Sequence, residues 1–93
     1  MSELKITHSV LRVGSFFLRN SAKRFSAYAL AKELDSPYNA VWEVLNRLED
    51  AGWLKSEMER VNPSVTPRPA RRLYRLTPDG ETKTRGLLKD LSV

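Results

Sequence analysis

Residues 36–54 read SPYNAVWEVLNRLEDAGWL, and this stretch decides the fold. Its aliphatic residues recur at the i, i+3, i+4 and i+7 spacing of one helix face. They are Val41, Val44, Leu45 and Leu48. Proline suits the first position of a helix and disfavours helical geometry in the residue before it, so the pattern predicts a helix from Pro37 with Ser36 as N-cap. Gly52 is placed to close that helix with a left-handed C-terminal cap.

Two further helices are expected before this one. Ile6, Val10, Val13 and Phe17 form a single stripe within a predicted helix from Leu4 to Leu18. A short second helix follows, with Ser26 as N-cap, and ends near Leu34. Residues 35–37 then make a tight break before the third helix. Two short helices separated by a tight turn are the parts of a helix-turn-helix.

The chain after Gly52 contains two segments with the character of β-strands. Residues 53–59 alternate in part between apolar and polar, and residues 72–76 are rich in aromatic and aliphatic side chains. The basic stretch between them holds Pro63, Pro67 and Pro69, which deny it regular structure. This pattern predicts a β-hairpin with a long tip. Thr77 and Pro78 then supply the N-cap and first position of a last helix.

The expected fold class is therefore α+β and mainly helical. It is a winged helix-turn-helix with three N-terminal helices, a two-stranded β-wing and one C-terminal helix. With 93 residues there is room for a single domain, which we assign to residues 1–93. Its core is expected over residues 4–76, with the C-terminal helix over residues 77–91.

Composition excludes several classes of function. The chain has no cysteine, so it can form no disulfide, thiolate metal site or cysteine nucleophile. Its only histidine, His8, has no arrangement of carboxylates around it in the sequence, and there is no glycine-rich phosphate loop. We expect neither an enzyme nor a site for a cofactor or metal. No apolar run approaches the roughly 20 residues of a membrane span, and no secretory signal is visible, so a cytoplasmic location and no membrane partner are expected.

The net charge of +5 is concentrated in the predicted wing. Between residues 60 and 75 there are five arginines and no acidic residue, whereas residues 1–54 are close to neutral. Guanidinium groups pair with phosphate oxygens, and a loop stiffened by proline loses less entropy on binding. We therefore expect phosphate or minor-groove contacts from the wing, although a solvated loop is the alternative. The candidates are Arg60, Arg68, Arg71 and Arg72.

The third helix is the predicted recognition helix. In this motif, residues near its N-terminus reach base edges in the major groove. The expected DNA-binding residues are Ser36, Tyr38, Asn39, Glu43 and Arg47. Asparagine can bond to adenine, and glutamate can accept from the cytosine amino group. Alternatively, Glu43 and Arg47 pair with each other at i and i+4, Asn39 is simply a surface residue, and Tyr38 stacks on the turn.

Further contacts are expected beside this helix. Lys23, Arg24 and Tyr28, around the start of the second helix, are candidates for phosphate contact, with a solvated loop as the alternative. Trp42 lies beside the core stripe, and we expect it to pack against the wing or first helix rather than to be exposed to nucleic acid.

Three segments carry a resemblance to a known family. Residues 41–54 resemble the "YxxLxRLExxGLL" core of PadR-like transcriptional regulators, and residues 71–80 resemble their "RRxYRLTxxG" wing and helix start. Ala27-Tyr28 is similar to the family's "YxI" entry into the second helix. The resemblance spans about residues 7–88, and the Leu-x-Arg-Leu-Glu-x-x-Gly element is shared with the more distant MarR group. Trp42 stands where the family usually has tyrosine, and Asn39 falls near its usual glycine.

The resemblance implies a regulator that binds duplex DNA and dimerises through its C-terminal helix. We expect a homodimer that occludes an operator as a repressor, without a small-molecule effector. The dimer contact would use the apolar residues Leu87, Leu88 and Leu91. Two alternatives remain open: an excisionase-like accessory that bends DNA in recombination, and a winged-helix module whose partner is a protein.

Overall fold

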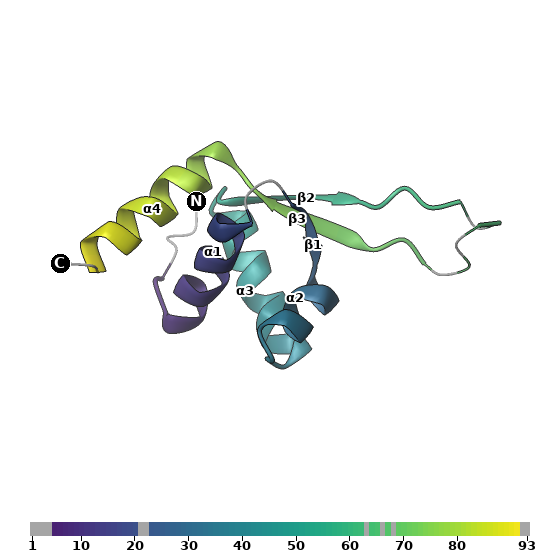
Figure 1. Ribbon diagram of the computed structural model, residues 1–93, viewed down its shortest axis with the longest axis horizontal. Helices are drawn as coiled ribbons and strands as arrows, with labels where there is room; N and C mark the ends of the chain where they lie inside the picture. Colours follow the sequence, from purple (N-terminus) through teal and green to yellow (C-terminus); the bar gives the residue numbers. More distant parts are fainter. Residues whose placement is uncertain (1–4, 21–22, 63, 66, 68, 92–93) are drawn as a thin grey trace.

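The structure is a computed structural model that describes residues 5–20, 23–62, 64–65, 67 and 69–91, with the Leu91 side chain left out. The elements in chain order are α1 (His8–Arg19), β1 (Phe25–Ser26), α2 (Ala27–Glu33), α3 (Tyr38–Asp50), β2 (Leu54–Met58), β3 (Arg72–Leu76) and α4 (Pro78–Leu91). Helices α1, α2 and α3 gather on one side of the sheet, while the β2–β3 hairpin projects away from them (Figure 1). This arrangement confirms the predicted α+β winged helix.

The sheet has three strands, not the two that were predicted. Its order is β1-β3-β2, with antiparallel pairing throughout. The short strand β1 pairs Phe25 with Tyr74 and Ser26 with Leu73. Strand β3 is therefore hydrogen-bonded on one side to the segment that enters α2 and on the other to the wing strand β2. The wing and the helix-turn-helix share one sheet.

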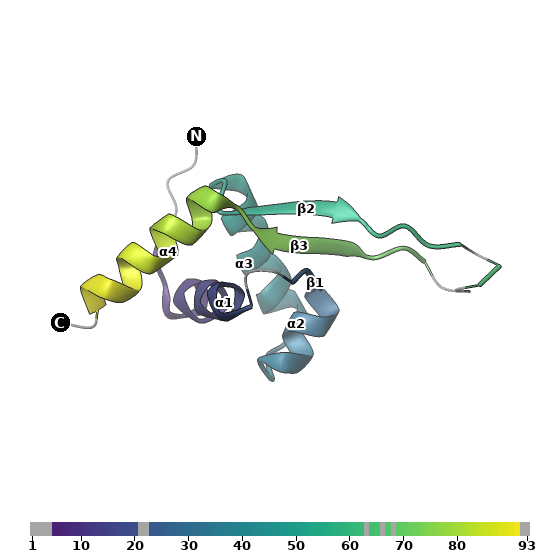
Figure 2. The same ribbon diagram turned by 45° about the horizontal axis from the view of Figure 1, so that its top comes forward.

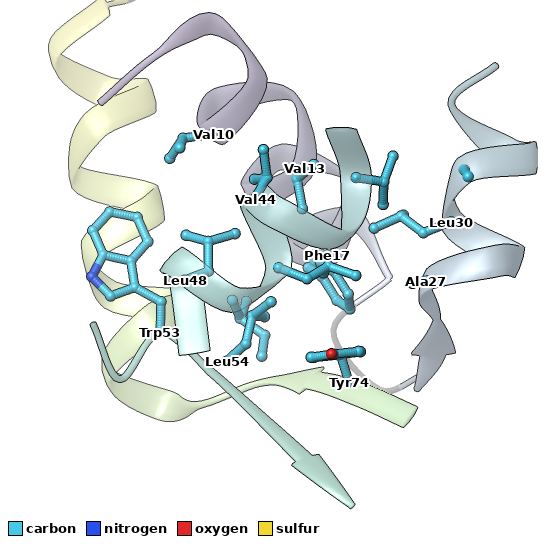
Figure 3. Close-up of a cluster of buried hydrophobic side chains, with 14 residues drawn as sticks. Val10, Val13, Phe17, Ala27, Leu30, Val44, Leu48, Trp53, Leu54 and Tyr74 are labelled. Carbon is cyan, nitrogen blue, oxygen red and sulfur yellow. The ribbon is translucent and has the colours of Figure 1, made fainter. Parts of the chain in front are cut away.

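The core lies between this sheet and the three N-terminal helices (Figure 3). The predicted stripe of α3 is buried throughout, as are the main apolar positions of α1 and α2. Phe16, Phe17 and Phe25 meet edge to face, with ring centroids 4.9–6.2 Å apart. This aromatic contact fixes the end of α1 against the entry to α2.

Several predicted helix ends are confirmed. The Ser26 hydroxyl accepts from the Ala29 N–H at 3.1 Å, and the Thr77 hydroxyl accepts from the Gly80 N–H at 2.9 Å. Gly52 has φ +81°, and the Trp53 N–H donates to the Leu48 carbonyl, which completes a Schellman cap on α3.

The predicted start of α1 at Leu4 is wrong. The helix begins at His8, because the Thr7 hydroxyl accepts from the Val10 N–H at 3.2 Å and so caps it there. Ile6 consequently lies before the helix and is exposed instead of continuing the buried stripe.

Candidate nucleic-acid interface

Helix α3 presents a polar face opposite its buried stripe. Tyr38, Asn39, Glu43 and Arg47 are exposed, as the periodicity predicted. Glu43 Oε1 accepts a hydrogen bond from Arg47 Nη2 at 2.5 Å. The pairing that we considered as an alternative to base contact is therefore present in the free protein.

The turn before α3 differs from the prediction. Ser36 does not cap α3: Pro37 occupies the N-cap position and offers no side-chain hydrogen bond. The Ser36 hydroxyl instead donates to the Leu34 carbonyl at 3.2 Å and accepts from Arg12 Nη1 at 3.1 Å. Arg12 Nη2 also donates to the Leu34 carbonyl, so α1 is tied to the turn. The first N–H groups of α3 are left without a side-chain cap, on the exposed side of the helix-turn-helix.

Asp35 sets the angle between α2 and α3. It has φ +49°, and the Ser36 N–H donates to the Ala31 carbonyl at 3.0 Å while the Asp35 N–H donates to Lys32. This is the same type of cap that Gly52 provides for α3, here formed by an aspartate. The left-handed residue directs the chain sharply into α3.

The wing arginines are held by different partners. Arg72 Nη1 donates to the Ser56 hydroxyl at 3.0 Å. That hydroxyl in turn donates to Glu49 Oε2, which also accepts from the Ser56 N–H at 3.1 Å. The end of α3 is thus connected through β2 to an arginine of β3. Sequence reasoning missed this chain of contacts, in which Arg72 and Ser56 are 16 positions apart.

Arg71 makes a cation–π contact with the ring of Tyr28, with its guanidinium carbon 5.6 Å from the ring centroid. The contact joins the wing to the first turn of α2. Arg60 is exposed, just beyond the end of β2. Arg68 lies outside the described residues. The structure therefore brings Arg71, Arg72 and Tyr28 together, as parts of one surface.

The segment before α2 supplies two more of the predicted residues. Lys23 is exposed. Arg24 Nη1 contacts Glu57 Oε1 of β2 at 2.6 Å, with both side chains about half exposed. The hydrogen bond from Arg24, followed by its positive charge, lowers the pKa of Glu57 below its usual value. In the free protein Arg24 is therefore engaged in an ion pair with the wing.

A hollow of about 290 Å³ lies between α2, the start of α3 and β3. Its lining residues are Ser26, Ala27, Tyr28, Tyr38, Trp42, Ala70, Arg71, Arg72 and Tyr74. None of these is acidic. Trp42 was expected to pack against the wing or the first helix; it borders the hollow that it shares with Arg71 and Arg72, but its side chain is 49% exposed and so is not packed away. Trp42 lies one turn after Tyr38 and beside the polar face of α3, and this position on the helix predicts an exposed side chain.

Tyr74 lies at the inner end of this hollow and belongs to the core. It is only 2% exposed. Burial, and then the nearby charge of Glu49, raise the pKa of its phenol above the ordinary value. The side chain is therefore neutral over the physiological range.

The predicted dimer residues lie on α4, which packs against α1. The two helices meet at Gly14, where a Cβ would be in van der Waals contact with the Thr84 side chain at 3.4 Å. Leu87 packs partly against the core of its own chain, and Leu88 is half-buried. The Leu91 side chain lies outside the described residues. Figure 2 shows α4 at the opposite end of the molecule from the wing tip.

The described part of the chain offers no cluster of three or more histidine, cysteine, aspartate or glutamate side chains able to hold a metal ion. None of the helices described there has the length and apolar character needed to cross a membrane.

No protein-family model matches the chain, and no curated protein has a significant match to it. Solved structures do match. A transcriptional regulator homologue from Pyrococcus horikoshii is 18% identical with a TM-score of 0.74, over 89% of this chain and 75% of that chain. A PadR family transcriptional regulator from Eggerthella lenta is 24% identical with a TM-score of 0.67, over 88% and 76%.

The apo form of MarR from E. coli is 20% identical with a TM-score of 0.70, over 89% of this chain and 56% of MarR. The chain thus spans little more than half of MarR. These likenesses show that the chain shares the winged-helix fold of a PadR family regulator and of MarR, which agrees with the predicted resemblance in fold.

Proposed function

We propose that this chain binds duplex DNA in a sequence-specific manner and regulates transcription without catalysis. The observation that carries the proposal is the joint surface of α3 and the wing. Exposed residues of α3, with Arg71 and Arg72 where β3 begins, border one hollow whose described lining has no acidic residue. Such a surface suits a polyanion, and the similarity in fold to transcriptional regulators supports the same function.

The geometry suggests how duplex DNA would be bound. The start of α3 would enter the major groove, which is about 12 Å wide and admits a helix. There Asn39 and Glu43 would face base edges, and the first N–H groups of α3 would face a phosphate. Arg71 and Arg72 would lie over the adjacent strand, toward the minor groove. Arg60 and Arg68 are proposed to extend this contact along the wing, while Lys23 and Arg24 would add phosphate contacts beside α2.

Binding would require an exchange of partners. Arg47 and Arg24 are paired with Glu43 and Glu57 in the free protein. Exposed ion pairs of this kind contribute little to stability. A phosphate can therefore replace the carboxylate at little cost, and the carboxylate of Glu43 becomes available to a base.

We further propose a homodimer that represses by occupying an operator. The dimer would form through α4 and α1, at the end of the molecule away from the wing (Figure 2). In two-fold symmetric helix-turn-helix dimers, half-sites lie about 34–36 Å apart, or one turn of DNA. Leu87, Leu88 and Leu91 are the proposed contacts.

The experiment is a selection of bound duplexes from a random pool, with the full chain at about 0.15 M salt. We expect an enriched motif, palindromic if the protein binds as a dimer, and tight binding of that motif in fluorescence anisotropy. Failure to retain any duplex at this salt would contradict the proposal and favour a protein partner. Binding without enrichment would exclude sequence readout. A circular-permutation assay on the selected site distinguishes a repressor from a DNA-bending accessory.

A further inference from the structure

Aromatic side chains are unusually exposed around the hollow. Of the six large apolar side chains that are exposed in the described part of the chain, three line it. Tyr28 is 61% exposed, Tyr38 50% and Trp42 49%. Scattered exposed apolar residues need no explanation, but rings gathered at one concave surface mark a binding site.

Tyr38 and Trp42 form a separate flank of α3. They are four residues apart and therefore lie one above the other on the helix. Both line the hollow opposite Ala70 and Arg71, whereas Asn39 and Glu43 do not line it. Helix α3 thus has a polar face with Asn39 and Glu43, directed outward, and an aromatic flank with Tyr38 and Trp42, directed toward the wing.

The position of this flank defines which part of a duplex it would meet. If α3 lies in the major groove and the wing lies over the neighbouring minor groove, the strand that separates the two grooves crosses the hollow. Arg71 and Arg72 then face the phosphates of that strand. The aromatic flank faces the base edges that lie next to the same backbone, in the major groove.

Only one natural base presents an apolar group there. Thymine carries its 5-methyl group in the major groove, on the side of the base nearest its own backbone, while the other bases present only hydrogen-bonding groups or C–H edges. The faces of the aromatic rings offer this methyl group a dry apolar contact, whereas a hydrogen-bonding group of another base edge, buried against a ring face, would lose its partner.

We propose that Tyr38 and Trp42 contact thymine 5-methyl groups on the strand whose phosphates are held by Arg71 and Arg72. The contact gives the protein a preference for A·T pairs next to the positions contacted by Asn39 and Glu43. The inference rests on the proposed binding of duplex DNA and adds the base that the aromatic flank recognises. The size of one methyl group predicts a preference of about fourfold per contacted thymine.

The test uses the selected duplex and replaces each thymine in turn with deoxyuridine, which removes only the methyl group. Competition anisotropy with the full chain measures the affinity of each duplex. We expect one or two positions where the replacement weakens binding by about fourfold, and no effect elsewhere. A selected site without thymine beside the α3 contacts, or equal affinity for every replacement, overturns the inference while leaving DNA binding intact.

Variants assign the effect to the aromatic flank. Trp42→Ala, whose fold is checked by its thermal midpoint, should bind the thymine and uracil duplexes equally. Tyr38→Phe keeps the ring and should keep the discrimination. Asn39→Ala serves as the matched control on the same helix: it should weaken binding but leave the ratio of thymine to uracil affinity unchanged. Discrimination that survives in Trp42→Ala and in Tyr38→Ala overturns the inference.

The same assay distinguishes two other outcomes. If the separated strands bind as tightly as the duplex, the rings stack on unpaired bases and methyl recognition in a groove is wrong. If neither single strands nor duplexes bind, the proposed function itself fails, and this inference fails with it.

Discussion

Gly80 lies directly against the backbone of Trp53: a Cβ at residue 80 would stand 2.1 Å from the Trp53 carbonyl oxygen. That oxygen also accepts the Thr77 N–H at 3.0 Å, and the Thr77 hydroxyl donates to the Gly52 carbonyl at 2.8 Å. The first turn of α4 is thereby attached to the turn between α3 and β2.

Gly80→Ala should destabilise the protein by about 1–3 kcal/mol, because the added methyl group meets backbone that cannot move aside. For a domain of this size, 1 kcal/mol corresponds to about 4–8 °C in the thermal midpoint. Gly86→Ala is the matched control. It lies in the same helix with nothing within 4 Å of its Cβ position, and it should be neutral or stabilising. Equal effects of the two substitutions would show that the contact at Gly80 is unimportant.

Arg71→Ala should weaken binding to all duplexes and reduce the slope of log affinity against log salt by about one unit. The reason is that a single phosphate contact, and the counterion that it releases, is lost. A salt titration with specific and random duplexes measures both quantities. Arg19→Ala, an exposed arginine at the end of α1, is the control for the change in net charge. An unchanged slope in Arg71→Ala would place the wing away from the phosphates.

Glu57→Gln should strengthen binding to duplex DNA a few-fold. Arg24 holds the pKa of Glu57 below its usual value, so this carboxylate is charged at neutral pH and competes with phosphate for the guanidinium. At pH values above the ordinary glutamate pKa, the ion pair stabilises the fold. This contribution is lost as the pH falls through the lowered pKa of Glu57. Anisotropy at pH 7 measures the affinity. Glu81→Gln removes the same charge from an ion pair on α4 and should have a much smaller effect.

Tyr74→Phe should make the free energy of unfolding less dependent on alkaline pH. The folded state raises the pKa of Tyr74 above its ordinary value of about 10, mainly through burial. Its stabilising contribution is complete below the unfolded pKa and is lost as pH rises through the folded pKa. Urea unfolding at pH 9 and pH 11 should show a smaller decrease for Tyr74→Phe than for the natural chain. Tyr28→Phe, at an exposed position, should behave like the natural chain.

The elements that could be predicted from the sequence are those whose signals are local. The stripe of α3, the cap at Ser26 and the glycine at position 52 each depend on neighbours within a few residues. Strand β1 could not be predicted, because two residues carry no periodicity and its pairing partner lies in β3. The cap assigned to Ser36 is wrong for a similar reason, since Arg12, 24 positions away, contacts its hydroxyl.

In the candidate site, too, features with a local sequence signal could be predicted and contacts between distant residues could not. Which residues of α3 are exposed was predictable from helical spacing, and the arginines of the wing were visible as a local excess of charge. Their partners were not, because Arg24 meets Glu57 across 33 positions and Arg72 meets Ser56 across the hairpin. Trp42 was misplaced because its apolar character suggested burial, whereas its angle on the helix places it at the edge of the hollow.

The central place of β3 has a consequence for how the wing can change. The pairing of β3 with β2 reaches Met58 and Arg72, and next to it the Glu59 N–H donates to the Arg71 carbonyl. Residues 60–70 lie beyond it. Loop closure costs only about 0.6 kcal/mol for each doubling of loop length. Insertions, deletions and replacements of basic residues in this segment can therefore accumulate while the strand pairing and the packing of α3 stay the same. The length and charge of the tip can change independently of the fold.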